Sequence, residues 1–223
     1  KPTIGEVSVF GVTPTSNDSI LRKIGLCPAL EPFYHRLTGY QWVLYLTRLH
    51  GIHASEAREL AKTALQNVGM EENMNRPISS YSLGMRQRCK LAQAMAHQPE
   101  LLILDEPMTG LDPIGRKEIR ELIMSLREEG RTVFFSTHIL PDVGMTCDRV
   151  SIIQSGKTQR TGRLADIIAE TTRGVIVVVT GLEKEAAAKL GVDYPTLEHL
   201  DDMYRIELPS DAEAQAFVAA ATG

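Results

Sequence analysis

The stretch 101–113, LLILDEPMTGLDP, constrains the fold more than any other part of the chain. It opens with a short aliphatic run that has the length and continuity of a strand buried on both faces of a parallel sheet. Asp105 and Glu106 follow directly, and Pro107 prevents a simple continuation of the strand ladder. In an open α/β sheet the carboxyl ends of the strands bind ligands. Two carboxylates there suit a hydrated Mg²⁺ and a water molecule that needs a general base.

Length and composition predict a globular protein with either one good core or one domain plus a small appendage. The 24 Lys and Arg residues against 28 Asp and Glu leave no electrostatic footprint for nucleic acid. Cys27, Cys89 and Cys147 are too far apart for a CxxC metal site, and their odd number does not indicate a disulfide framework. A reducing cytoplasm fits this usage best. Since no apolar stretch approaches the roughly 20 residues of a membrane-spanning helix, we expect any membrane role to go through a partner.

Apolar periodicity predicts alternating strands and helices over most of the chain. The expected strands are 4–10, 24–27, 101–104, a buried strand at 132–136, and 149–153. The expected helices are 19–23, 37–49, 55–68, 82–97, 113–130 and 139–145. After about residue 172 the pattern changes to a small α+β unit with strands at 175–179 and 204–208 and helices at 184–190 and 212–221. The chain opens on Lys1 and stops after a helix with no following strand, so we expect a fragment of a longer protein.

Two further motifs flank the carboxylates. Residues 81–88 read YSLGMRQR, and residues 134–138 read FFSTH. Together with 101–113, they resemble the signature motif, the switch histidine, and the Walker B segment with its D-loop in ABC-transporter ATPase domains. The motifs agree with that family in their identity, and also in their order and spacing along the chain.

The resemblance covers about residues 1–165 and implies an α/β fold of the P-loop NTPase class. The parallel-sheet core would lack its first strands, and a helical subdomain would span about 37–97. Residues 172–223 would form a small, incomplete α+β appendage at the C-terminus. The appendage and the loop length look most like the ATPase subunits of ABC-2-type exporters.

By this resemblance, Asp105 holds Mg²⁺ through water and Glu106 polarises the attacking water as a general base. Buried carboxylates are costly unless a cation or hydrogen-bond donors satisfy them, which argues against a packing role. His138 would contact the γ-phosphate and the attacking water from the same sheet edge. The alternative for a lone histidine is an ordinary core or surface position.

The signature region departs from the usual LSGGQ, with Leu83 in place of the first glycine and Met85 in place of glutamine. Ser82 and Gly84 still open a helix whose unpaired N–H groups and dipole favour a phosphate. We therefore expect Ser82, Gly84 and Met85 to contact nucleotide. Asp112, in the D-loop, would cross to the partner subunit. Ser82 and Asp112 are also ordinary helix caps, and both interpretations can hold.

The sequence contains a decoy for the phosphate-binding loop. Residues 155–158 read SGKT, but the loop needs a glycine where Ser151 stands. A turn between two strands explains the segment better. By resemblance the true Walker A loop would lie upstream of Lys1, so we expect these 223 residues alone not to hydrolyse ATP.

The loop at 27–35 carries a second departure. Family members usually have a glutamine after the Cys-Pro or Leu-Pro pair, and here that position is Ala29. Alanine has no side-chain donor or acceptor, so it cannot contact a metal. The loop is therefore either a simple surface loop or one with a retained mechanical role.

The resemblance implies an ATP- and Mg²⁺-dependent ATPase that works as a homodimer or heterodimer with composite sites. Its partners would be a second ATPase subunit and membrane permease subunits, at the cytoplasmic face of the membrane, with no nucleic acid. Apolar residues in 37–49, including Trp42 and Tyr45, predict a docking surface for the permease. Two alternatives stay open: a non-transport ABC ATPase acting on ribosomes or DNA, and a catalytically weak regulatory ATPase.

Overall fold

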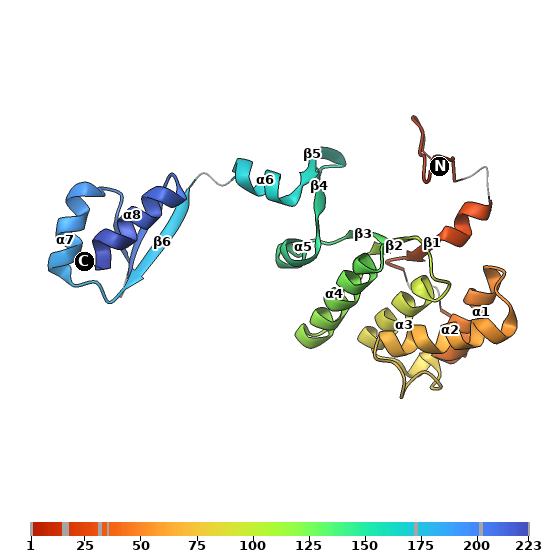
Figure 1. Cartoon of the computed structure of the whole chain (residues 1–223). Helices are drawn as coiled ribbons and strands as arrows, with labels where there is room; N and C mark the ends of the chain where they lie inside the picture. Colours follow the sequence, from red (N-terminus) through yellow and green to blue (C-terminus); the bar gives the residue numbers. More distant parts are fainter. Residues whose placement is uncertain are drawn as a thin grey trace. The chain divides into compact units, whose positions relative to one another are not determined.

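A computed structural model describes most of the chain, as residues 2–14, 18–30, 33–34, 36–171, 174–200 and 203–222. The chain divides into two compact units, residues 1–147 and 148–223 (Figure 1). Each unit has its own hydrophobic cluster. Within the described part of the chain, no helix combines the length and the apolar composition needed to cross a membrane.

A parallel sheet forms the centre of the first unit. Its strands are β1 (Ile24–Cys27), β2 (Leu101–Asp105) and β3 (Thr132–Ser136), in the order β1-β2-β3. The strand that carries the carboxylates is thus the middle one, and its Leu102 and Leu104 are buried. The prediction of a buried strand at 132–136 is wrong for Phe134, which is 65% exposed. Phe134 lies beside Ile103 on a face of the sheet that the described residues cover only in part.

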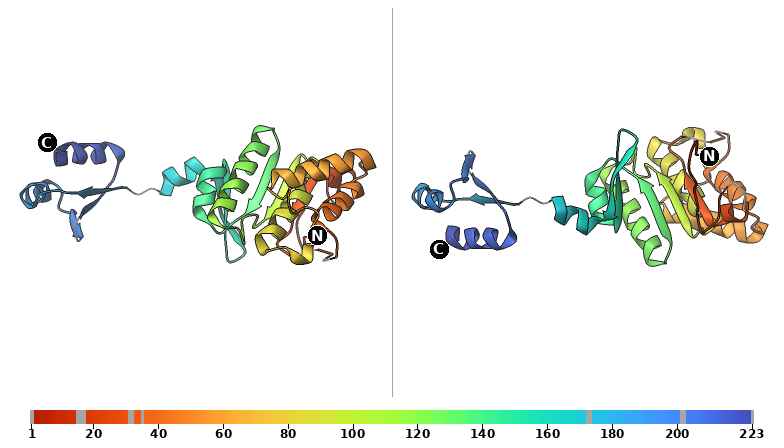
Figure 2. Two further views of the ribbon diagram at one scale, coloured as in Figure 1. Left: turned by 90° about the horizontal axis from the view of Figure 1, so that it is seen from below. Right: turned by 90° about the horizontal axis from the view of Figure 1, so that it is seen from above.

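Five helices and two 3₁₀ turns accompany this sheet in the described part of the first unit. They are η1 (Asp18–Lys23), α1 (Gly39–Leu49), α2 (Ala54–Asn67), η2 (Ile78–Ser80), α3 (Leu83–Met95), α4 (Pro113–Glu128) and α5 (Leu140–Thr146). Thr38 and Gln41 form a reciprocal capping box that starts α1. The helices α3 and α4 pack on the sheet (Figure 2). The predicted helices are confirmed, with boundaries that differ by a few residues.

Two further expectations for this unit are wrong. Residues 4–10 form no strand, because the chain reverses at Phe10 and Gly11 and makes only an isolated bridge between Val9 and Val12. Trp42 is not available for docking, since it is only 6% exposed and packs edge-on against Phe33.

The second unit contains a hairpin, a helix and a small α+β layer. The antiparallel hairpin joins β4 (Arg149–Gln154) to β5 (Lys157–Arg163), and α6 (Leu164–Thr171) follows. Ser155 and Gly156 form its turn with φ of 50° and 73°, which confirms that SGKT connects two strands.

The remaining elements form an antiparallel sheet in the order β6-β8-β7 with helices packed on it. They are β6 (Val175–Thr180), α7 (Lys184–Asp193), β7 (Glu198–Leu200), β8 (Met203–Leu208) and α8 (Asp211–Thr222). The fully buried Phe217 of α8 lies in the core between helices and sheet. Strand β7 has only three residues and was not predicted, because EHL carries no strand pattern. The domain division at about 165–172 stays a prediction, and the hairpin lies on the second unit's side of the observed division.

Two stacked histidines join the end of α1 to the start of β1. The rings of His50 and His97 lie 3.6 Å apart and nearly parallel, and His97 Nε2 lies 3.0 Å from the carbonyl oxygen of Ile24. His97 Nδ1 is buried without a hydrogen-bond partner among the described residues. Burial, with the nearby His50 as a smaller cause, lowers the pKa of His97 to about 4. The fold therefore favours the neutral ring.

We predict that acidification weakens the fold through His97. The folded pKa of His97 lies below its unfolded value of about 6.5. The contribution of the neutral ring to the free energy of unfolding is therefore complete above pH 6.5 and is lost as the pH falls toward 4. The slope from this one group is at most about 1.4 kcal/mol per pH unit. Urea denaturation at pH 7.5 and 5.0 measures the difference in the free energy of unfolding. His97→Gln, whose amide can replace the bond to Ile24, should lose clearly less stability between these pH values, and an equal loss in both proteins would contradict the prediction.

Candidate functional site

The site begins where β2 and β3 end side by side. The parallel register places Asp105 opposite Ser136. The Ser136 hydroxyl donates to Asp105 Oδ1 at 2.7 Å and accepts from the Glu106 backbone N–H at 3.0 Å. One hydroxyl from the neighbouring strand therefore holds both residues of the carboxylate pair. Sequence reasoning gave Ser136 no role, although its place two residues before His138 was a usable signal.

The backbone at Glu106 adopts an uncommon conformation. Its φ is 49°, which costs a residue with a side chain of the order of 1–3 kcal/mol unless the surroundings enforce it. Gln87 of α3 provides such support, because its Nε2 donates to the carbonyl oxygens of Glu106 at 3.2 Å and of Pro107 at 2.9 Å. Hydrogen bonds from α3, the helix that begins at the signature motif, thus stabilise the sharp turn after β2. The sequence shows Gln87 as part of a motif but does not indicate this contact.

The Glu106 carboxylate is oriented at both oxygens. His138 Nδ1 lies 2.9 Å from Oε1, and the Thr109 hydroxyl donates to Oε2 at 3.2 Å. Because an ionised carboxylate only accepts hydrogen bonds, Nδ1 of His138 carries a proton in this arrangement. The other ring nitrogen then donates to a ligand only when the ring is fully protonated. The structure thus brings Glu106 and His138 together across 32 residues of sequence, on the sheet edge where they were expected.

The remaining predicted residues form a second cluster. Ser82, Gly84, Met85 and Asp112 line a hollow of about 380 Å³ with the neighbouring Leu83, Arg88, Gly110 and Leu111. The Ser82 hydroxyl accepts from the Met85 N–H at 3.2 Å, and Asp112 Oδ1 accepts from the Gly115 N–H at 3.0 Å. Both residues therefore cap helices, as one interpretation expected, and their contact with nucleotide stays a prediction.

The unusual Leu83 has a structural explanation. Gly110 has φ of 78°, and a Cβ added there would lie only 2.7 Å from Leu83 Cδ2. The leucine thus occupies the space above a glycine of the D-loop. The signature motif tolerates a large residue at this position because the opposing residue has no side chain.

The residues present fit Mg²⁺ bound together with a nucleotide. In such sites Mg²⁺ keeps several waters and takes one or two protein carboxylates plus phosphate oxygens. Asp105 supplies such a carboxylate, whereas both oxygens of Glu106 are engaged by His138 and Thr109. Among the described residues, no group of three or more His, Cys, Asp or Glu side chains forms a cage for a metal ion.

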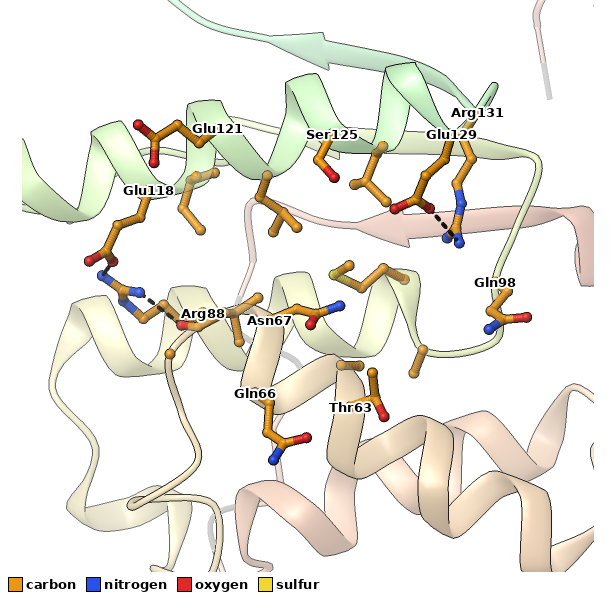
Figure 3. A pocket seen from close by; sticks show the side chains of 18 of the residues that line it. Thr63, Gln66, Asn67, Arg88, Gln98, Glu118, Glu121, Ser125, Glu129 and Arg131 are labelled. Carbon is orange, nitrogen blue, oxygen red and sulfur yellow. Dashed lines mark hydrogen bonds and ion pairs between the residues drawn. The ribbon is translucent and has the colours of Figure 1, made fainter.

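A larger hollow of about 770 Å³ lies between α2, α3 and α4 (Figure 3). Arg88 spans one end, with Nη2 2.7 Å from Glu118 and Nη1 2.8 Å from the carbonyl oxygen of Val68. At the other end Arg131 pairs with Glu129 at 3.0 Å. Asp105, Glu106 and His138 do not line this hollow, so it is separate from the cluster at the ends of β2 and β3.

Known proteins resemble this chain in both sequence and structure. The family model described as ABC transporter matches residues 1–109. The bacitracin transport ATP-binding protein BcrA of Bacillus licheniformis is 43% identical over 159 residues, which cover 70% of this chain and 51% of BcrA. The linearmycin resistance ATP-binding protein LnrL of Bacillus subtilis is 31% identical over 213 residues, which cover 94% of this chain and 68% of LnrL.

Among solved structures, the dimeric ATP-binding cassette MJ0796, in a post-hydrolysis state with ADP and Pi, aligns with a TM-score of 0.67 at 25% identity. The alignment covers 74% of this chain and 75% of that one. The chain spans about half the length of BcrA. Its ordered motifs, its parallel sheet and these similarities show that it belongs to the ABC transporter family of ATP-binding proteins and has their α/β P-loop NTPase fold.

Proposed function

We propose that the protein is the ATP-binding and ATP-hydrolysing subunit of a membrane ABC exporter. The observation that carries this proposal is the oriented Glu106 carboxylate, held between His138 and Thr109 at the carboxyl end of the central strand. BcrA and LnrL, named for transport and resistance, support the link to export. The place of action would be the cytoplasmic face of the membrane, beside permease subunits.

In this mechanism Glu106 accepts a proton from the water that attacks the γ-phosphate. His138 contacts one oxygen of the carboxylate and Thr109 donates to the other, and these two contacts keep the carboxylate oriented toward the water. Asp105, fixed by Ser136, would hold Mg²⁺ through water, and the ion would neutralise phosphate charge.

The second cluster suits a role in a dimer. Ser82, Gly84, Met85 and Asp112 lie together at the start of α3 and in the D-loop, where backbone N–H groups and the helix dipole favour a phosphate. We infer that this cluster faces the nucleotide of a second ATPase subunit, so that each site is composite. The dimeric state of MJ0796 supports this inference.

A catalytically weak regulatory ATPase is the second candidate. Ala29, Leu83 and Met85 favour it, since each replaces a residue that family members usually have. The intact Glu106 and His138 pair favours active hydrolysis instead. Turnover of the full-length protein distinguishes the two.

For the full-length protein we predict that Glu106→Gln keeps ATP binding and loses turnover by about 10²- to 10⁴-fold, because the amide keeps the shape and removes the base. ATP affinity and steady-state phosphate release are the measurements. Glu121→Gln, the same change on an exposed part of α4, is the matched control and should act like the parent. Turnover of Glu106→Gln at the parent rate would exclude the base role, and loss of ATP binding would indicate a structural one.

We propose that Tyr45 and Leu49 of α1, which are 48% and 81% exposed, form part of the docking surface for the permease. We predict that Tyr45→Glu with Leu49→Glu releases the full-length ATPase from its permease, because a buried unpaired charge opposes apolar contact. Co-purification of the two subunits measures the release, and basal hydrolysis should stay at the parent rate. Thr63→Glu, on the exposed side of α2, is the control. Undiminished co-purification of the double variant would contradict the assignment.

A further inference from the structure

Lys90 of α3 is a buried lysine with an unusual set of partners. Its residue is 3% exposed, and its ammonium group donates to the carbonyl oxygens of Pro28 at 3.0 Å and Ala29 at 3.1 Å. A buried ammonium is costly unless hydrogen bonds or an opposite charge satisfy it. These two bonds therefore have to persist for the charge to remain buried.

Among the described residues, the hydrogen bonds of the Lys90 ammonium go to carbonyl oxygens and to no carboxylate. Cys27 lies close by, but burial raises the pKa of its thiol to about 11, against the smaller opposing effect of Lys90, so the thiol stays neutral. The Asp105 charge also acts on this thiol, and Cys27 pairs with Leu104, the residue before Asp105. The ammonium thus lies near the end of the sheet that carries the predicted metal ligand.

Lys90 is the middle one of three polar side chains spaced three residues apart on α3. Gln87 bonds the backbone after β2, and Gln93 Nε2 donates to the carbonyl oxygen of Leu26 in β1 at 3.1 Å. Gly25 adds to this coupling, since a Cβ there would overlap the carbonyl oxygen of Ala94 in the same helix. The helix that begins at the signature motif therefore holds both the turn after β2 and the loop after β1.

At position 29 the contact is made by the backbone. The Ala29 side chain has no donor or acceptor, whereas its carbonyl oxygen is bound by Lys90. We propose that Lys90 is a positioning residue that keeps the loop at 28–30 in register with the signature helix, through backbone carbonyl oxygens in place of a side chain at position 29. The kinetic consequence of this proposal rests on the proposed ATPase function. The structural part, the hold of Lys90 on the loop, is independent of that function.

Hydrogen exchange of the full-length protein, measured without ATP, tests the structural part without any ATPase activity. Lys90→Met keeps the length and removes the donors, so the end of β1 that leads into the loop should open more often. The peptide that covers residues 24–27, which pair with β2, should exchange about tenfold faster or more, which corresponds to about 1.4 kcal/mol. Lys90→Arg keeps a buried cationic donor and should restore most of the protection. Ala29→Gln leaves the carbonyl in place and should exchange like the parent.

Two exchange results would overturn the proposal. One is unchanged protection of residues 24–27, the strand that leads into the loop, in Lys90→Met. The other is an equal loss of protection throughout α1, α2 and α3, which would make Lys90 a general stabilising residue with no specific hold on the loop. Peptides from β2 and α4 provide the internal reference for local effects.

The kinetic part uses the full-length protein. Lys90→Met should lower kcat about tenfold while the KM for ATP changes less than about twofold, because the loop is displaced but the nucleotide contacts remain. Lys90→Arg should recover most of kcat. Parent kcat in Lys90→Met, despite a loosened loop, would overturn the link to catalysis. A parent protein with no turnover would instead refute the proposed function and leave the exchange result valid.

Discussion

The site depends on the parallel register between β2 and β3. This register puts Asp105 opposite Ser136, whose hydroxyl bonds both the aspartate and the Glu106 amide. A shift by one residue would turn every side chain of β3 to the other face and remove this hydroxyl from the pair. His138, two residues further on, would then no longer lie against Glu106. The chemistry expected of the carboxylates therefore follows from strand pairing as much as from their own identity.

The helix α3 adds a second constraint, because parallel strands end with carbonyl groups that the sheet no longer pairs. Gln87 donates to the carbonyl oxygens of Glu106 and Pro107, and Lys90 donates to those of Pro28 and Ala29. Buried carbonyl groups need such donors. The polar residues on the inner side of α3 thus satisfy the strand ends and connect the signature motif to both loops of the sheet edge.

The signature and D-loop residues show that capping and ligand binding are compatible. Ser82 and Asp112 satisfy one N–H each at the start of α3 and α4. A helix start has four N–H groups without partners inside the helix, so other donors remain for a phosphate. Leu83, which departs from the family pattern, packs over Gly110, where no side chain opposes it.

The sequence alone determined the features that depend on neighbouring residues: the aliphatic strand β2, the helices capped by Ser82 and Asp112, and the turn at Ser155 and Gly156. It also identified the family, because the order of the motifs can be read directly from the sequence. Only the tertiary structure decided the features that depend on distant partners. Residues 4–10 lack a strand ladder, Trp42 is buried against Phe33, and Lys90 binds a carbonyl oxygen 61 residues away. Burial and hydrogen bonds between residues far apart in the sequence produce no local sequence pattern. The sequence alone therefore does not indicate that Lys90 contacts the loop after β1.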